Sequence, residues 1–258
     1  MELYNTDILN AMFATVSRCL ANKNSNTVGI AFSGGVDSTV LAYICRNLGQ
    51  EVVLLTVGFA DSYDISFSKK ISSIMNMSHE FLEICSNEFY TVAQNIRKKI
   101  HCNNISHIEN CIAFHFVSKL ALEHNIRTII SANGCDEIFC GYNIFRVLFE
   151  FGNPTIIKTI KEKLKLEYEL VNEIKYMCNN LGVEVWQPFL SKDFLEIGFK
   201  IPVSLKIKSS SDLLRKHILR KIALNLEVPE DVIISRKKAF QYGSSIHKNY
   251  KKIHLKSI

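Results

Sequence analysis

The chain has 258 residues, 47% of them apolar and 22% charged, a composition that suits one large folded domain and excludes a disordered chain. No apolar run approaches the ~18 residues that a membrane helix needs, and the start MELYNTDILN lacks the basic segment of a signal peptide, so a cytoplasmic protein is expected. The net charge of +6 is uneven: from Lys200 onward 14 Lys and Arg outnumber 4 Asp and Glu, which suits an anionic ligand such as a nucleotide or nucleic acid.

The first half of the chain alternates between helical and strand patterns. Apolar residues recur with helical spacing over residues 7–21, 37–49, 65–76 and 107–125. Short β-rich apolar runs predict buried strands over residues 27–32, 51–59, 79–85 and 127–132. Apolar strands that alternate with helices indicate a parallel α/β sheet covered on both faces.

The pattern changes after about residue 142. Residues 158–182 are helical and highly charged, and only residues 183–186 resemble another strand. We therefore expect a single domain over residues 1–258, with a nucleotide-binding α/β sheet in 1–145 and a mostly helical substrate or closing region in 146–258.

A loop rich in glycine and hydroxyl groups follows the first predicted strand, in the sequence AFSGGVDST. Gly34 and Gly35 allow a ligand to approach the backbone closely, and the next helix offers its free N–H groups and partial positive charge. Together with the hydroxyl groups they predict a phosphate or pyrophosphate site. Asp37 would be repelled by polyphosphate unless Mg²⁺ lies between them. An ordinary capped turn is the plainer alternative, and the spacing matches neither a Walker A motif nor G-x-G-x-x-G.

Two further stretches extend this site. SANGCDEIFCGY, residues 131–142, follows the fourth predicted strand and offers Asp136 as a second carboxylate for the metal, although acidic residues also favour an ordinary helix start. SRKKAFQYGSS, residues 235–245, brings lysines and aromatic residues before a flexible segment. A lysine there could neutralise charge on leaving pyrophosphate, whereas a charged surface loop is the alternative.

Cysteine and histidine carry no metal-site pattern. The eight cysteines are scattered without a C-x-x-C pair, and the eight histidines lack ligand-like spacing. Reduced, mostly buried thiols are therefore expected, and a zinc site is not.

These stretches resemble a known family. SGGVDS is similar to the pyrophosphate loop of the N-type ATP pyrophosphatases, and SANGCDEIFCGY resembles the signature of asparagine synthetases within that group. VEVWQPFLSKDFLEIGFKIP, LLRKHILRKIA and RKKAFQYGS follow in the family's order, so the likeness covers about residues 25–246. It implies the Rossmann-like, adenine nucleotide alpha-hydrolase-like fold of the synthetase domain.

The resemblance also implies roles for individual residues. Those implied to hold the ATP phosphates are Ser33, Gly34, Gly35, Asp37 and Ser38, with Asp37 and Asp136 binding Mg²⁺. Those implied to line the rest of the nucleotide site are Ala31, Val57, Ala132 and Asn133. The lysine that stabilises departing pyrophosphate is Lys238 by spacing from Arg236, or Lys237 by spacing back from Gly243.

The implied reaction is an amide-forming ligation. A carboxylate attacks ATP to give an acyl-adenylate and pyrophosphate, and ammonia or another amine then displaces AMP.

Three departures of this sequence from the family's motifs bear on the expected substrate and nitrogen source. Position 2 is Glu rather than the nucleophilic Cys of a glutaminase domain, so free ammonia, a separate glutaminase subunit or another amine is expected as the nitrogen source. Asn133 stands where asparagine synthetases usually have Glu, and Ser191 stands where they have Asp.

Two alternatives remain open. Other pyrophosphate-loop enzymes adenylate tRNA bases, and the basic end of this chain would suit tRNA, but the paired cysteines of such enzymes are missing, so a nucleic-acid partner is not expected. The chain could also bind ATP and have lost acyl transfer, an alternative that Asn133 keeps open.

Overall fold

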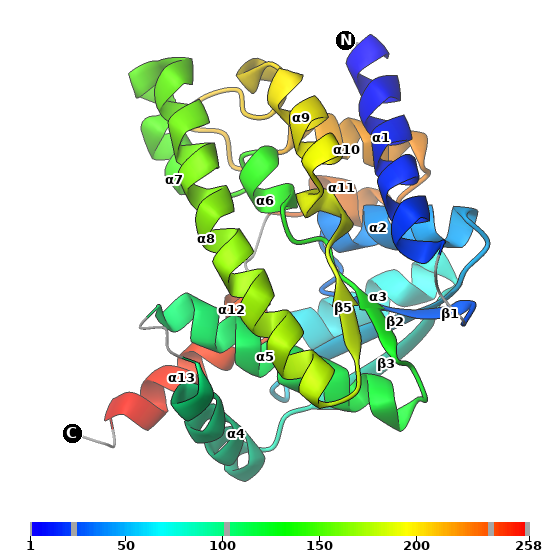
Figure 1. Cartoon of the computed structure of the whole chain (residues 1–258). Helices are drawn as coiled ribbons and strands as arrows, with labels where there is room; N and C mark the ends of the chain where they lie inside the picture. Colours follow the sequence, from blue (N-terminus) through cyan, green and yellow to red (C-terminus); the bar gives the residue numbers. More distant parts are fainter. Residues whose placement is uncertain (1, 22–24, 101–103, 237–239, 256–258) are drawn as a thin grey trace.

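A parallel five-stranded sheet forms the centre of the protein (Figure 1). The computed structural model describes residues 2–21, 25–100, 104–236 and 240–255. The strands are β1 (Thr27–Ala31), β2 (Glu51–Gly58), β3 (Ser78–Glu83), β4 (Thr128–Ile130) and β5 (Glu184–Trp186). They lie in the order β3-β2-β1-β4-β5, and every neighbouring pair is parallel. The predicted α/β fold class is confirmed.

Helices account for most of the remaining described residues. They are α1 (Glu2–Leu20), α2 (Val36–Asn47), α3 (Tyr63–Met75), α4 (Ser86–Lys99), α5 (Ile105–Glu123), α6 (Cys135–Ile138), α7 (Ile144–Val147), α8 (Gly152–Asn180), α9 (Lys192–Lys200), α10 (His217–Asn225), α11 (Glu230–Ile234), α12 (Phe240–Gly243) and α13 (Ile246–Leu255). Short 3-10 helices are η1 (Leu148–Phe151), η2 (Pro188–Leu190) and η3 (Val203–Leu205).

The two faces of the sheet bury different helices. Val28, Ile30 and Leu54 belong to one apolar core together with α1 and α2. Leu55 and Ile129 belong to a second core together with α4 and α5. Side chains alternate between the faces of a strand, so this division follows from the strand sequences themselves. A sheet covered on both faces explains why its strands are apolar throughout.

The helical second half of the chain is built into the same cores. β5 extends the sheet beyond β4, with Val185 opposite Ile129. Helices α9 and α10 share a core with α1 and α2, and the end of α8 shares the other core with α5. In Figure 1 the long helix α8 runs diagonally past α5 and connects these regions. The segment after residue 146 therefore contributes both a strand and core residues.

One helix has no counterpart among the sequence predictions. In α4 the buried residues are Phe89, Val92, Ala93 and Ile96, which recur at helical spacing. They form an apolar stripe that packs in the same core as α5. The signal is present in the sequence, although lysine and arginine fill the helix's last turn.

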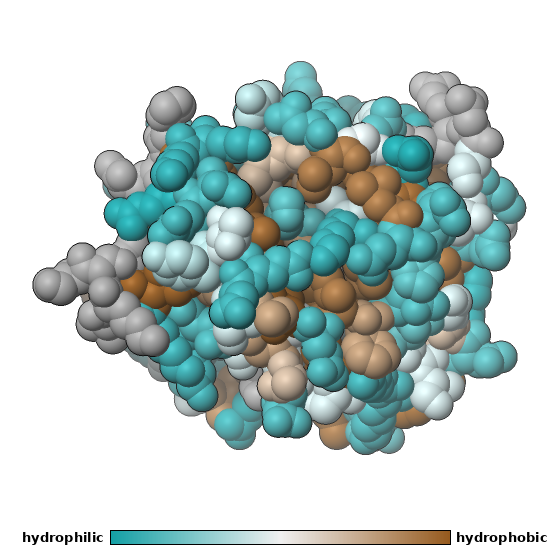
Figure 2. Space-filling view, turned by 90° about the horizontal axis from the view of Figure 1, so that it is seen from below, coloured by the Kyte–Doolittle hydropathy of each residue, from teal (hydrophilic) through white to brown (hydrophobic). Residues whose placement is uncertain are grey.

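The outer surface mixes polar and apolar residues. On the face drawn in Figure 2, apolar residues form small groups among hydrophilic ones. Within the described ranges, no helix has both the length and the apolar character needed to span a bilayer.

Lys206 gives a stability prediction. Its side chain is buried, its Nζ donates to the carbonyl of Gly198 at 2.8 Å, and burial lowers its pKa from 10.5 to about 8. At pH 7 the folded protein therefore holds a charged ammonium group in an unfavourable environment. We expect Lys206→Met to raise the free energy of unfolding at pH 7 by about 1–3 kcal/mol.

The stability gain of Lys206→Met should become smaller as the pH rises. Between pH 8 and 10.5 the folded state has released the Lys206 proton and the unfolded state retains it, so wild-type stability rises with pH and the advantage of Lys206→Met shrinks. Urea unfolding at pH 7 and pH 9.5 measures both effects, with the exposed Lys200→Met as control. A less stable variant at pH 7 would mean that the bond to Gly198 outweighs the burial of charge.

Candidate active site

The strand order creates a crevice between β1 and β4. The chain leaves β1 through α2 on one face of the sheet, whereas it passes from β4 to β5 through α8, whose end lies in the core of the other face. At such a reversal the loops beyond the carboxyl ends of the strands diverge, and open α/β sheets bind ligands there. Both glycine-containing stretches identified in the sequence, residues 33–38 and 131–136, follow these two strands.

The loop after β1 has the geometry of an anion site. Gly34 has φ +74°, and a Cβ at that position would lie 2.8 Å from Cδ1 of Phe67, so glycine is required on both counts. Gly35 caps α2 without a side-chain hydrogen bond, so the backbone N–H groups in the first turn of the helix are left for a ligand or solvent to bind. The Ser38 hydroxyl donates to the Gly35 carbonyl at 3.2 Å and holds the loop to the helix.

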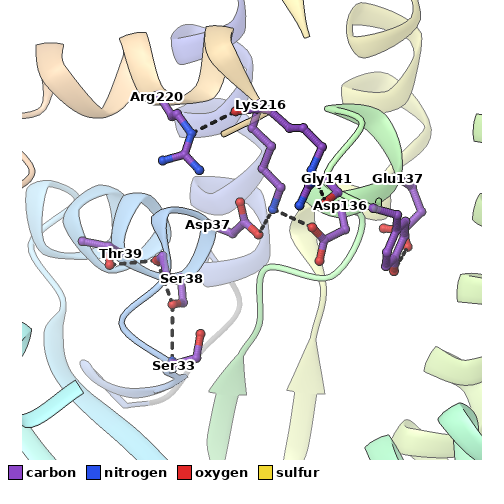
Figure 3. Close-up of polar contacts among 12 residues, drawn as sticks. Ser33, Asp37, Ser38, Thr39, Asp136, Glu137, Gly141, Lys216 and Arg220 are labelled. Atoms are coloured by element: carbon purple, nitrogen blue, oxygen red, sulfur yellow. Dashed lines mark hydrogen bonds and ion pairs between the residues drawn. The ribbon is translucent and has the colours of Figure 1, made fainter. Parts of the chain in front are cut away.

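A buried lysine joins the two stretches (Figure 3). Lys216 Nζ forms ion pairs with Oδ2 of Asp37 and with Oδ1 of Asp136, the latter at 2.6 Å. The lysine side chain is 0% exposed, whereas the two aspartates keep 14% and 18% of their side-chain surface. Lys216 is not among the site residues predicted from the sequence. Its position within LLRKHILRKIA, as the basic residue that precedes an apolar helix, is the signal that could have indicated it.

A strained backbone segment positions the Lys216 side chain between the two aspartates. Arg215 and Lys216 both adopt left-handed conformations, with φ 53° and 54°. Asp212 Oδ1 accepts the backbone N–H of Arg215 at 3.0 Å, and the Arg215 Nε donates to the carbonyl of Gly141 at 3.0 Å. A Cβ on Gly141 would overlap both Asp136 and Lys216, so the ion pair fits only against glycine.

The same two carboxylates fit a magnesium ion. Asp37 Oδ1 is buried and has no hydrogen-bond partner among the described residues. Mg²⁺ is commonly held by one or two carboxylates together with substrate phosphate oxygens. Asp37 lies in the first turn of α2, beside the predicted phosphate loop, and Asp136 faces it across Lys216. The donor set therefore suits a metal that arrives with a polyphosphate.

A cavity of about 350 Å³ adjoins this centre. Among the predicted site residues, those that line it are Ala31, Ser33, Gly35, Asp37, Ser38, Ala132, Asn133 and Asp136. Gly34 is not among its lining residues, and neither is Val57, which is fully buried in the core shared with α5. The volume falls within the range typical of small-molecule sites.

The predicted lysines Lys237 and Lys238 lie outside the described residues. Their neighbours Arg236 and Phe240 both line the cavity. The segment before them is held by Arg220, whose guanidinium donates to the carbonyls of Ile233 and, at 3.0 Å, Ser235. The described residues on either side of the two lysines therefore lie at the cavity.

The far wall of the cavity carries a second group of polar residues. Tyr142 donates its hydroxyl to Glu137, and burial, with the charges of Glu167 and Asp136, raises the pKa of Glu137 well above its usual range. Glu167 comes from the middle of α8 and also lines the cavity. Because α8 contains many charged residues, the sequence does not indicate that Glu167 is the one that lines the cavity. Ser191, in contrast, caps α9 and is not among the lining residues.

The chain is similar in sequence to proteins of one known family. The asparagine synthase family model matches residues 8–165 and 158–257. A putative glutamine-hydrolyzing asparagine synthetase of Methanocaldococcus jannaschii is 27% identical over 257 residues, covering 88% of this chain and 47% of that protein. Asparagine synthetase B of Escherichia coli is 23% identical over 232 residues, covering 83% and 41%. An NMN synthetase structure from Francisella tularensis matches with a TM-score of 0.48 and 12% identity over 99% of this chain and 93% of that one.

The fold is a parallel α/β sheet in which a glycine loop and two aspartates meet beyond the ends of β1 and β4. The family model covers nearly the whole chain, and the chain belongs to the asparagine synthase family. The predicted resemblance is confirmed, and membership supports an ATP-dependent amidating ligase. The chain spans less than half the length of these curated relatives.

Proposed function

We propose that this chain activates a carboxylic acid as an acyl-adenylate, releasing pyrophosphate from ATP, and transfers the acyl group to ammonia or another amine. The observation that carries the proposal is the meeting of Asp37 and Asp136 at Lys216, beside the glycine loop and the N-terminus of α2. Anion-binding backbone, two carboxylates suited to Mg²⁺ and a buried cation are the groups that pyrophosphate release requires.

Each residue has a part in the first step. The backbone of Gly35 and the first turn of α2 bind the departing phosphates, with the hydroxyls of Ser33 and Ser38 beside them. Lys216 supplies positive charge where pyrophosphate leaves, and Lys237 or Lys238 adds to that charge. Ala31 and Ala132 form the wall against which the adenosine lies.

Asp37 and Asp136 are the residues that would hold Mg²⁺, which when bound offsets the negative charge of the phosphates. The two aspartates also hold Lys216 in a fixed position, so the cation needs little reorganisation when charge develops. Asn133 precedes α6, which carries Asp136, and both residues line the cavity.

The proposed nitrogen donor is ammonia or an organic amine. Ammonia can come from solution or from a separate glutaminase subunit, and an organic amine is the other option. We place the reaction in the cytoplasm and expect no nucleic-acid partner.

Pyrophosphate release tests the function. The protein is incubated with ATP, Mg²⁺ and ammonium chloride in the presence of single carboxylic acids, with L-aspartate first, and Asp37→Ala serves as the inactive control. We expect one acid to release pyrophosphate together with AMP and an amide product. ATP binding without pyrophosphate for any acid would refute the ligase, and would favour a nucleic-acid substrate or a domain that only binds nucleotide.

A further inference from the structure

Part of the cavity is lined by apolar side chains from α5 and α8, two helices that pack against each other. Asn110, Phe114 and Val117 recur on α5 with helical spacing, so they share the face of α5 that meets the cavity. Leu166 and Leu170 stand one turn apart on α8 and line the cavity from that helix. Phe114, Val117 and Leu170 are almost completely buried. These five residues define the part of the cavity that we call the apolar slot.

The polar groups at the start of α5 are uncharged. Asn110 Nδ2 donates to the carbonyl of Ser106 at 2.7 Å, and Gln241 Nε2 donates to Ser106 Oγ at 3.2 Å. Burial lowers the pKa of His107 below its usual range, so its ring is neutral at pH 7. Ser106, His107 and Gln241 all line the cavity. A ligand in the slot therefore meets neutral hydroxyl, imidazole and amide groups at this end of α5.

A buried carboxylate adjoins the slot on α8. Glu167 follows Leu166 directly, lines the cavity, and accepts a hydrogen bond from Asn133 Nδ2 at 2.6 Å. Asp64, in the first turn of α3, is a further buried acidic residue in the cavity wall. A ligand that brought a second carboxylate into the slot would be repelled by Glu167, and Asp64 adds to the negative charge of the same cavity.

The basic residues that line the cavity are engaged by other groups. Lys216 is held by two aspartates, and Arg220 donates to backbone carbonyls of the segment that leads to Arg236. Lys163 comes from α8 and lies over the ring of Tyr142, with Nζ 5.5 Å from its centroid. Among the described basic lining residues, Lys163 is the one that shares a helix with the slot.

The position of the slot suits the acyl group of the proposed reaction. In a displacement at phosphorus the attacking and leaving oxygens lie roughly in line, so the acid approaches on the side opposite to the departing pyrophosphate. Pyrophosphate leaves toward the glycine loop and Lys216. Asp136, which pairs with Lys216, and Asn133, which binds Glu167 of α8, stand three residues apart. The segment after β4 therefore connects the phosphate centre to the slot.

We propose that the acid activated by this chain is a monocarboxylic acid with an apolar body, and that this body binds in the apolar slot. The inference rests on the proposed amide-forming function and names its substrate class. Burial of the apolar body against Phe114, Val117 and Leu170 supplies binding free energy. The second carboxylate of a dicarboxylic acid such as aspartate would lose its water there and meet Glu167, so such acids are poor substrates.

Pairs of acids with equal numbers of non-hydrogen atoms test this preference. The pairs are 4-methylpentanoate with succinate, and L-leucine with L-aspartate. Pyrophosphate release is measured for each acid with ATP, Mg²⁺ and ammonium chloride, and all acids that release pyrophosphate are ranked by kcat/KM. Apolar monocarboxylic acids should exceed their dicarboxylic partners by at least about tenfold.

A lysine placed in the slot should change the ranking. Leu166 is 40% exposed, so the ammonium group of Leu166→Lys can remain hydrated and the variant should fold. It should lower kcat/KM for the apolar acid by about tenfold and raise it for the dicarboxylic partner, with the KM for ATP within about twofold of wild type. Leu224→Lys, at an exposed position on α10, should leave every value unchanged. If Leu166→Lys melts early, the ranking of acids by the wild type still decides the outcome.

Two results would overturn the inference. One is a higher kcat/KM for the dicarboxylic acids in the wild type, and loss of that preference in Lys163→Met would then assign their second carboxylate to Lys163. The other is a raised KM for ATP in Leu166→Lys with the ranking of acids unchanged, which would place the adenine rather than the acyl group in the slot. Absence of pyrophosphate with every acid would instead refute the proposed function itself.

Discussion

Replacement of Lys216 by Met should destabilise the protein and greatly slow pyrophosphate formation. The lysine is completely buried between Asp37 and Asp136, so its removal leaves two carboxylates facing each other without the cation. Breaking a buried ion pair by removing one partner costs about 3–5 kcal/mol. Loss of one preorganised charge at the leaving group also lowers the rate by ~10²–10³-fold.

The stability loss should depend on magnesium. In EDTA nothing replaces the lysine charge, whereas Mg²⁺ with ATP can occupy the space between the two aspartates. The melting temperature of Lys216→Met should therefore rise more on addition of Mg²⁺ and ATP than that of the wild type. Thermal melts in EDTA and in Mg²⁺ with ATP measure the difference.

The matched control is Lys192→Met, because the Lys192 side chain is 88% exposed on α9. It should melt like the wild type and retain full activity. If Lys216→Met melted at the wild-type temperature in EDTA, the ion pair would not contribute to the folded state, and the assignment of Lys216 to the centre of the site would be wrong.

The sheet and its phosphate loop could be predicted because their signals are local. Residues 27–32 and 51–59 are apolar runs of strand length, and the glycines at 34 and 35 follow the first of them directly. Parallel strands bring their carboxyl ends to one edge, so residues 131–136 could be expected near the loop. In the structure both stretches follow neighbouring strands and line the same cavity.

Lys216 and Glu167 could not be predicted in this way. Lys216 lies 179 residues from Asp37 in the sequence and reaches it only because Arg215 and Lys216 adopt left-handed backbone conformations. Glu167 is one of many charged residues in α8, and helical periodicity cannot say which turn will meet the loop after β4. Both depend on tertiary packing, whose signal is spread over the whole chain.

Val57 illustrates a different limit. The resemblance implies a nucleotide-lining role for it at the end of β2, which stays a prediction, and its side chain lies in the core shared with α5. Strand side chains alternate between faces, so a shift of one residue decides between core and cavity. A motif transferred by position alone cannot resolve that choice.

Asp136→Asn should separate the two functions of the ion-pair centre. The amide keeps the size of the carboxylate but is a poor ligand for Mg²⁺. Pyrophosphate formation should fall by ~10²-fold or more, and the Mg²⁺ concentration at half-maximal rate should rise. Stability should change little, because Lys216 retains its partner Asp37. Titration of the rate with Mg²⁺ and a melting curve in EDTA measure the two effects, with the exposed Asp193→Asn as control.

The double variant Asp136→Asn/Lys216→Met tests whether the two residues interact. Lys216→Met alone leaves two facing carboxylates, whereas the double variant leaves one, so it should be more stable in EDTA than Lys216→Met. The coupling energy between the two positions should be about 1–3 kcal/mol. Additive losses would mean that Asp136 and Lys216 do not interact in solution. A stability gain without any recovery of pyrophosphate formation would show that the lysine and the aspartate stabilise each other in the fold and act separately on ATP.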